Sequence, residues 1–156
     1  MSLEKLYSMP GHLIRRCQQI SVGIYLDECK QFDLKPVDFA VLSALDSFTD
    51  IDQITLSGLI AIDRSSIGRV VENLEGKGLI SRRADSQDRR TKRLRLTKQG
   101  GAQFAQIKSS VDHVQERILK PLSKTQRTQF INCLEKIALH NNEISRVPVR
   151  SAPPQK

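Results

Sequence analysis

The sequence predicts a mainly α-helical protein with one small β-hairpin. Six stretches place apolar residues at spacings of three and four, which is the period of a helix with one buried face. Two short segments, 79–84 and 92–96, alternate apolar and polar residues and flank a polar loop, as the strands of a hairpin do. The charge is also uneven, because residues 63–98 hold eleven Lys and Arg against five acids, or +6 of the chain's net +8.

The helices expected from this periodicity span 9–31, 36–48, 53–60, 64–77, 98–119 and 124–145. Their ends carry recognisable start and stop residues. Asp52 and Asp63 are good N-caps for the third and fourth helices, because a carboxylate accepts from the free N–H groups of a first turn. Gly78 supplies the left-handed residue that ends the fourth helix. Gly58, inside the third helix, permits the close approach of DNA or of a neighbouring helix.

Composition limits the classes of function. The 156 residues, 38% hydrophobic and 27% charged, suit one domain or two small lobes sharing a core. No apolar run approaches the roughly 18 residues of a membrane span, and the N-terminus lacks the apolar core of a signal peptide, so a cytoplasmic protein without a membrane partner is expected. Three scattered cysteines and three scattered histidines predict neither a metal nor a cofactor. Glycine loops and catalytic motifs are missing, so an enzyme is not expected.

Helices 53–60 and 64–77 are joined by a tight link and followed by the hairpin, which describes a winged helix-turn-helix. Residues 36–97 are therefore the expected DNA-binding lobe. The flanking segments, 1–35 and 98–146, carry apolar stripes larger than so small a lobe can cover, and they are the expected helical dimerisation lobe. The proline-rich tail 147–156 is expected to be disordered.

The early, outward side of helix 64–77 is the candidate base-reading surface. Short donors and an arginine there suit base edges in a major groove, so Ser65, Ser66 and Arg69 are expected at or next to bases. Arg64 is expected on a phosphate. Four further cations of the hairpin are also assigned to phosphates: Arg89, Lys92, Arg93 and Arg95.

At these residues the sequence resembles the MarR family of bacterial transcriptional regulators. The matching pieces are IDRSSIGRVVENLEGKGLISR, the loop DSQDRR and LRLTKQG, in an order that covers about residues 10–145. The resemblance implies a homodimeric winged helix-turn-helix, usually a repressor, released from a palindromic operator by a small ligand or by thiol oxidation. It also implies that Asp88 orients Arg90 for insertion into a minor groove. The alternative is that Asp88 only holds the hairpin turn.

Ligands of such regulators commonly lie between the dimer lobe and the DNA lobe, which the resemblance places near the first two helices. A cationic or hydrogen-bonding group over an apolar floor suits an aromatic or heteroaromatic carboxylate, or its thioester. The residues expected to form this site are His12, Arg15, Arg16, Phe39 and Leu42.

Two other functions stay open. A thiol-based redox sensor would use Cys17, which lies beside Arg15 and Arg16. The place of Cys17 on the apolar stripe of its helix favours a buried structural cysteine instead. An architectural winged helix that does not regulate transcription would bind DNA without sequence preference.

Overall fold

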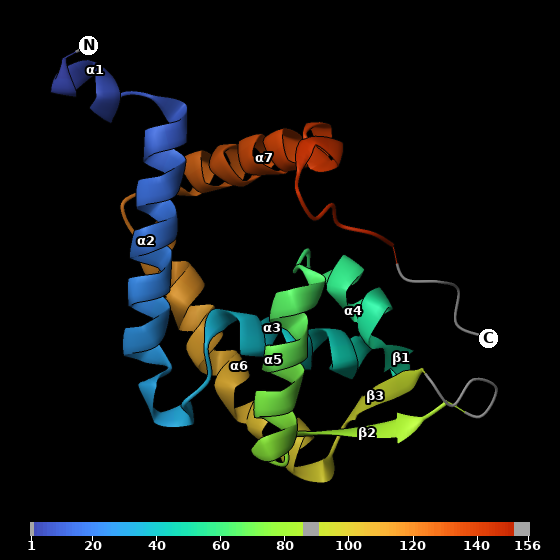
Figure 1. Ribbon diagram of the computed structural model, residues 1–156. Coiled ribbons are helices and arrows are strands. Elements are labelled where there is room, and N and C mark those ends of the chain that lie inside the picture. The colour runs from blue at the N-terminus through green and yellow to red at the C-terminus, as the bar shows by residue number, and fades with distance from the viewer. Residues whose placement is uncertain (1, 86–90, 152–156) are drawn as a thin grey trace.

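The computed structural model describes residues 2–85 and 91–151 (Figure 1). Its elements in chain order are α1 (Leu3–Tyr7), α2 (Pro10–Glu28), η1 (Lys30–Phe32), α3 (Pro36–Ser47), β1 (Ile51–Asp52), α4 (Gln53–Leu59), α5 (Arg64–Gly76), β2 (Ile80–Ala84), β3 (Lys92–Leu96), α6 (Lys98–Leu119), α7 (Lys124–His140) and η2 (Asn142–Ile144). The predicted fold class, mainly α with a small wing, is confirmed.

The centre of the molecule is a winged helix-turn-helix. Helices α4 and α5 are joined by a short turn, and strand β1 before them pairs with the hairpin after them in an antiparallel sheet of order β1-β3-β2. The register pairs Ile80 with Leu96 and Arg82 with Leu94. Ile67, Val71 and Leu74 of α5 are fully buried, because their spacing places them on the one face that turns toward the sheet and α3.

Helix α6 connects the winged helix-turn-helix to the helices on either side of it in the sequence. It packs against α2 along one part of its surface and against α3 along another, and Figure 1 shows α2 and α6 side by side. Its buried residues are Gly100, Phe104, Ile107, Val111 and Val114. Within residues 2–85 and 91–151, none of the helices combines the length and the hydrophobicity needed to cross a bilayer.

The structure differs from the sequence prediction at five places. The first long helix ends at Glu28 and is followed by η1, where one helix to residue 31 was expected. Helix α1 and strand β1 were not expected, and the last helix ends at His140, followed by η2, rather than near residue 145. The tail was expected to be disordered from residue 147. Up to Ser151 it is instead described with definite contacts, including a hydrogen bond from the Arg150 N–H to the Gly58 carbonyl at 2.9 Å. Residues 152–156 lie outside the described chain.

Candidate nucleic-acid interface

The start of α5 is fixed by the carboxylate of Asp63. One of its oxygens accepts from the backbone N–H groups of Ser65 at 3.1 Å and Ser66 at 2.9 Å. The same oxygen accepts from the Ser65 hydroxyl at 2.5 Å. This hydrogen bond from the Ser65 side chain, together with those from Ser66, lowers the pKa of Asp63 well below its usual range. The expected N-cap is confirmed, and it stays ionised.

The outward side of α5 carries the predicted DNA contacts. Arg64, Ser65 and Arg69 are exposed, and Ser66 is half-buried. The Ser65 hydroxyl donates its hydrogen to the cap, so toward a base it has lone pairs to offer rather than a donor. Arg69 therefore remains the strongest base-reading group of the four, because its guanidinium combines reach with several donors.

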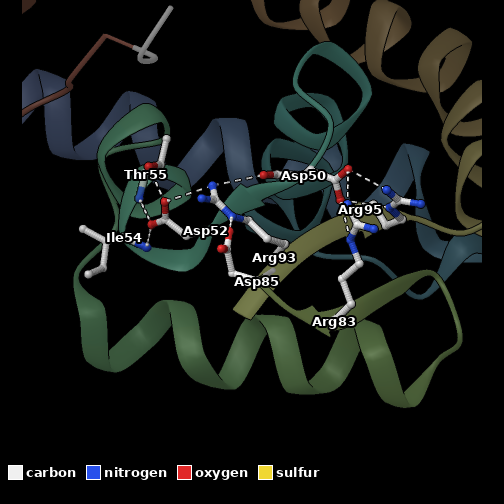
Figure 2. A network of polar contacts seen from close by, with 8 residues as sticks. All are labelled: Asp50, Asp52, Ile54, Thr55, Arg83, Asp85, Arg93 and Arg95. Atoms are coloured by element: carbon white, nitrogen blue, oxygen red, sulfur yellow. Dashed lines mark hydrogen bonds and ion pairs between the residues drawn. The ribbon is translucent and has the colours of Figure 1, made fainter. Parts of the chain in front are cut away.

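The wing is tied to the helix-turn-helix through Asp50, which lies just before β1 (Figure 2). Its carboxylate accepts two hydrogen bonds from Arg83 of β2, at 3.1 and 2.8 Å, and two from Arg95 of β3, at 3.1 and 2.5 Å. The hydrogen bond from Arg95 is the main cause that lowers the pKa of Asp50. One acid thus bridges both strands of the hairpin.

Arg93 forms the second tie between the wing and the helices. Its Nε donates to the carboxylate of Asp85, and its Nη1 lies 3.2 Å from the Asp50 carbonyl oxygen and 3.7 Å from the carboxylate of Asp52. Asp52 is also the N-cap of α4, accepting from the N–H groups of Ile54 and Thr55, each at 2.9 Å. Figure 2 shows these contacts as one connected network.

Arg93 and Arg95, which were assigned to phosphates, are each held by an acid in the described chain. The basic segment 63–98 therefore divides into cations that build the wing and cations that remain available. Within the described residues, the cations with ion pairs are Lys77, Arg82, Arg83, Arg93 and Arg95. Arg64, Arg69, Lys92 and Lys98 have no ion pair among those residues, and the first three are predicted DNA contacts.

The tip of the wing, residues 86–90, lies outside the described residues. The expectation for Asp88, Arg89 and Arg90 falls on this segment and stays a prediction. Lys92 is exposed and pairs across the hairpin with Ala84, at the end of the strands nearest the tip. The phosphate contact expected of Lys92 stays a prediction.

The residues expected to hold a ligand are divided between two regions. On α2, Arg15 and Arg16 each donate to Gln19 at 3.3 Å and are exposed, and the ring of His12 lies 5.4 Å from that of Tyr7. The other two residues are core-facing, because Leu42 is fully buried and the ring of Phe39 packs on Phe104 at 5.5 Å. The single chain does not gather these five residues around one cavity.

A cavity of about 710 Å³ lies elsewhere, between the end of α2, the start of α3 and the side of α5. Its lining combines cations with apolar residues, and it also includes the acids Asp33 and Asp38. Lys35 and Arg69 are among its cations, and Leu34 and Val37 are among its apolar residues. Sequence reasoning missed this cavity, because its walls combine the chain around residues 26–38 with the side of α5, which is distant in the sequence.

The cysteines are also placed differently from expectation. Cys17 is exposed in the single chain, whereas a buried structural cysteine was favoured at this position. Cys29 is the buried one, and burial raises the pKa of its thiol. Cys17 lies among Leu13, Ile14 and Ile20, which are about half exposed on the same helix.

The chain is similar to known proteins in both sequence and structure. A sequence model of the MarR family matches residues 34–92, which cover α3, the helix-turn-helix and the start of β3. Over this segment the chain is similar to the MarR family. The likeness extends beyond this segment in solved structures of transcriptional regulators, two of which match over 88% of this chain.

Three solved structures of similar proteins extend the comparison. The repressor CouR, solved bound to a 23-mer DNA duplex, is 27% identical, with a TM-score of 0.82 over 88% of this chain and 98% of CouR. PcaV from Streptomyces coelicolor, solved with its natural ligand, is 29% identical, with a TM-score of 0.79 over 88% and 97%. BpsR from Bordetella bronchiseptica, whose DNA binding is regulated by 6-hydroxynicotinic acid, is 25% identical, with a TM-score of 0.81 over 85% and 94%.

Proposed function

We propose that this chain is a MarR-family regulator, a homodimeric repressor that binds a palindromic operator and is released by a small aromatic or heteroaromatic acid. The observation that carries the proposal is the outward side of α5. There Arg64, Ser65 and Arg69 are exposed next to a wing whose described strand arginines are held by acids. A capped helix with free cations, beside a braced hairpin, suits insertion into a major groove with the wing over the adjoining backbone.

The uncovered apolar faces of α2 and α7 support the homodimer. Helix α7 has 17 residues, and none of them is buried in the single chain. Its Ile131, Leu134 and Ile137 are 42–50% exposed. Leu13 and Ile14 of α2 are exposed to the same degree, at 47% and 50%. Apolar surface on this scale needs a partner, and a second copy also supplies the twofold symmetry of a palindrome.

The DNA-reading residues of each protomer follow from the exposed cations. Arg69 contacts a base edge, with Ser65 and Ser66 beside it, and Arg64 and Lys92 contact phosphates. For the wing tip we retain Asp88, Arg89 and Arg90 as proposed contacts, on the basis of the family resemblance alone. Two recognition helices would then occupy major grooves about one helical turn apart.

The proposed effector is an organic acid with an aromatic or heteroaromatic ring. The support is the cationic surface over apolar residues in this chain, together with the heteroaromatic acid that regulates BpsR. Two places could take such an acid. One is the α2 surface with His12, Arg15 and Arg16, next to the faces that a partner would cover. The other is the cavity of about 710 Å³ behind α5, where a ligand would meet Arg69 itself.

Release of DNA requires that the acid bind the DNA-free protein more tightly than the DNA-bound protein. The test is a titration of the protein–operator complex with a panel of aromatic and heteroaromatic carboxylates, followed by fluorescence anisotropy of the labelled duplex. We expect at least one acid to release the DNA, and calorimetry to give the same acid a tighter Kd without DNA. If no acid in the panel binds the free protein or releases the duplex, the effector proposal is wrong.

Two variants assign the site. Arg15→Ala with Arg16→Ala removes the cations of the α2 surface, and Lys35→Ala removes a cation from the cavity behind α5 without touching the base-reading residues. Loss of acid binding in only one variant, with operator affinity kept, identifies the site. Lys108→Ala on the exposed side of α6 is the matched control.

A further inference from the structure

The chain after α7 returns to the helix-turn-helix of the same protomer. We call residues 145–151 the returning segment, and Figure 1 shows it, in red, running from the end of α7 toward α4. The backbone N–H of Arg150 donates to the carbonyl of Gly58 in α4 at 2.9 Å. A second anchor joins Val149 to Asn142 of η2, through hydrogen bonds of 2.9 and 3.2 Å in the two directions.

Gly58 is what lets the returning segment approach α4 so closely. A Cβ at this position would lie 3.1 Å from the Cβ of Arg150 and 3.4 Å from its Cγ. Both distances are at or inside the usual limit for such atoms. The glycine in the middle of α4, which costs helix propensity, therefore has a packing role that involves only this segment.

A shallow groove of about 340 Å³ runs between the returning segment and the start of α5. Three arginines line it: Arg64, Arg146 and Arg150. The acid in the groove is Asp63, whose carboxylate already accepts the cap hydrogen bonds of α5. Arg150 also pairs with Glu143 at 2.7 Å, but both side chains are more than half exposed, so the pair is weak and phosphate can compete for the guanidinium.

The returning segment does not cover the base-reading side of α5. Arg64, Ser65 and Arg69 remain exposed with the segment in place, so it borders the proposed DNA surface rather than blocking it. Arg146 and Arg150 are also exposed. The segment thus adds two cations to the edge where Arg64 is expected to meet a phosphate.

We propose that the returning segment is an additional DNA-contacting element, in which Arg146 and Arg150 bind backbone phosphates beside the one that Arg64 contacts. The contact extends the interface past the recognition helix and the wing, and it carries no base specificity. This inference rests on the proposed function. It assigns to the tail of the chain a role in affinity and in its salt dependence.

The test compares the wild-type protein with the double variant Arg146→Ala/Arg150→Ala on a duplex carrying the selected operator. Binding is measured by anisotropy between about 50 and 250 mM salt, a range over which phosphate contacts change affinity strongly. We expect the variant to bind at least about tenfold more weakly at the low-salt end. We also expect the slope of log K against log salt to become shallower by about 0.9 for each lost phosphate contact, or up to roughly 3.6 for the four arginines of a dimer.

Two further variants separate the outcomes. Lys108→Ala/Lys120→Ala removes the same charge from exposed positions of α6 and its end, and it is expected to keep both affinity and slope close to wild type. Arg146→Lys/Arg150→Lys keeps the charges and is expected to retain most of the affinity. Melting temperature and sedimentation of each variant check that fold and assembly are unchanged.

An Ala double variant that matches the Lys108/Lys120 control in affinity and slope would overturn the inference. An Ala double variant that binds DNA more tightly than wild type would also overturn it, because the segment would then be competing with DNA. Failure of the proposed function looks different: the wild-type protein itself would show no preference for the selected operator over an unrelated duplex.

Discussion

At the scale of single residues, aspartates organise the interface. Asp52 and Asp63 cap the two helices of the helix-turn-helix, and both could be predicted because a cap depends only on residues two and three positions away. Asp50 could not be predicted in the same way. Its partners, Arg83 and Arg95, lie 33 and 45 positions further along the chain, and alternation in a strand does not tell whether an outward arginine is free or paired.

Asp63→Ala should lower the thermal stability of the protein, because the N–H groups of Ser65 and Ser66 lose their acceptor. The pKa of Asp63 is lowered in the folded state, so its contribution is fully present above the unfolded pKa of about 3.9 and is lost as the pH falls through the lower folded value. The difference in Tm from wild type should therefore hold from neutral pH to about pH 4 and shrink only below it. Thermal unfolding across this pH range measures it.

Asp63→Asn is the control, since its amide oxygen keeps an acceptor and should retain most of the stability without the acid dependence. A Tm difference for Asp63→Ala that has already vanished well above pH 5 would contradict the assignment of this carboxylate as the cap.

Asp50→Ala should reduce the preference for operator over unrelated DNA. The substitution frees Arg83 and Arg95, which raises non-specific attraction to phosphates, and it removes the tie that orients the wing. Competition between an operator duplex and an unrelated duplex measures the ratio, and a several-fold fall is expected. Asp46→Ala, at an exposed position of α3, is the control. A ratio equal to that of the control would mean that the wing does not depend on Asp50.

At the scale of elements, the sequence predicted those helices and strands that are long enough to show a hydrophobic period and that have definite end residues. Helix α5 has a cap at Asp63, a buried stripe and a left-handed Gly78, whose φ is 71°, and its predicted and observed bounds agree within a residue. Strand β1 has two residues and α1 has five, which is too short for any periodicity to register. Their existence depends on tertiary contacts, such as the pairing of Ile51 with Leu94.

Within α5, the two free arginines should differ in their effect on DNA. Arg69→Ala should cost about 1–3 kcal/mol on the operator and relax the base preference at one position of each half-site. Arg64→Ala should weaken all sequences alike and reduce the salt slope by about 1 per protomer. Binding to operators mutated one base pair at a time, at two salt concentrations, distinguishes these effects. If both variants gave the same pattern, the division of roles along α5 would be wrong.

At the scale of the whole molecule, the chain has two distinct surfaces. One is the basic surface proposed to bind DNA, and the other is the set of uncovered apolar faces proposed to form the dimer. The sequence indicated both, as a basic segment at 63–98 and as apolar stripes on the flanking helices. It could not show that α6 packs against both α2 and α3 and so links the proposed dimerisation lobe to the DNA-binding lobe. Nor could it show that the chain after α7 returns to α4, since this contact depends on one backbone hydrogen bond and a missing side chain.

Leu134→Glu with Ile137→Glu should dissociate the proposed homodimer while leaving the core of each protomer intact, because neither residue is buried in the single chain. A charge left unpaired in an apolar interface costs several kcal/mol, so the dimer Kd should rise by about a hundredfold or more. Sedimentation measures this change. The control Asn132→Glu lies on the opposite side of α7. A double variant that remains as dimeric as this control would place the dimer interface elsewhere.

The central claim is that two copies of the α5 helix read a twofold-symmetric DNA site. Selection of bound duplexes from a random-sequence library by the purified protein, followed by sequencing, tests it most directly. We predict that the bound duplexes are enriched in an inverted repeat with half-site centres about one helical turn, or about 10 base pairs, apart. Enrichment of no sequence, or of a motif without twofold symmetry, would contradict the claim.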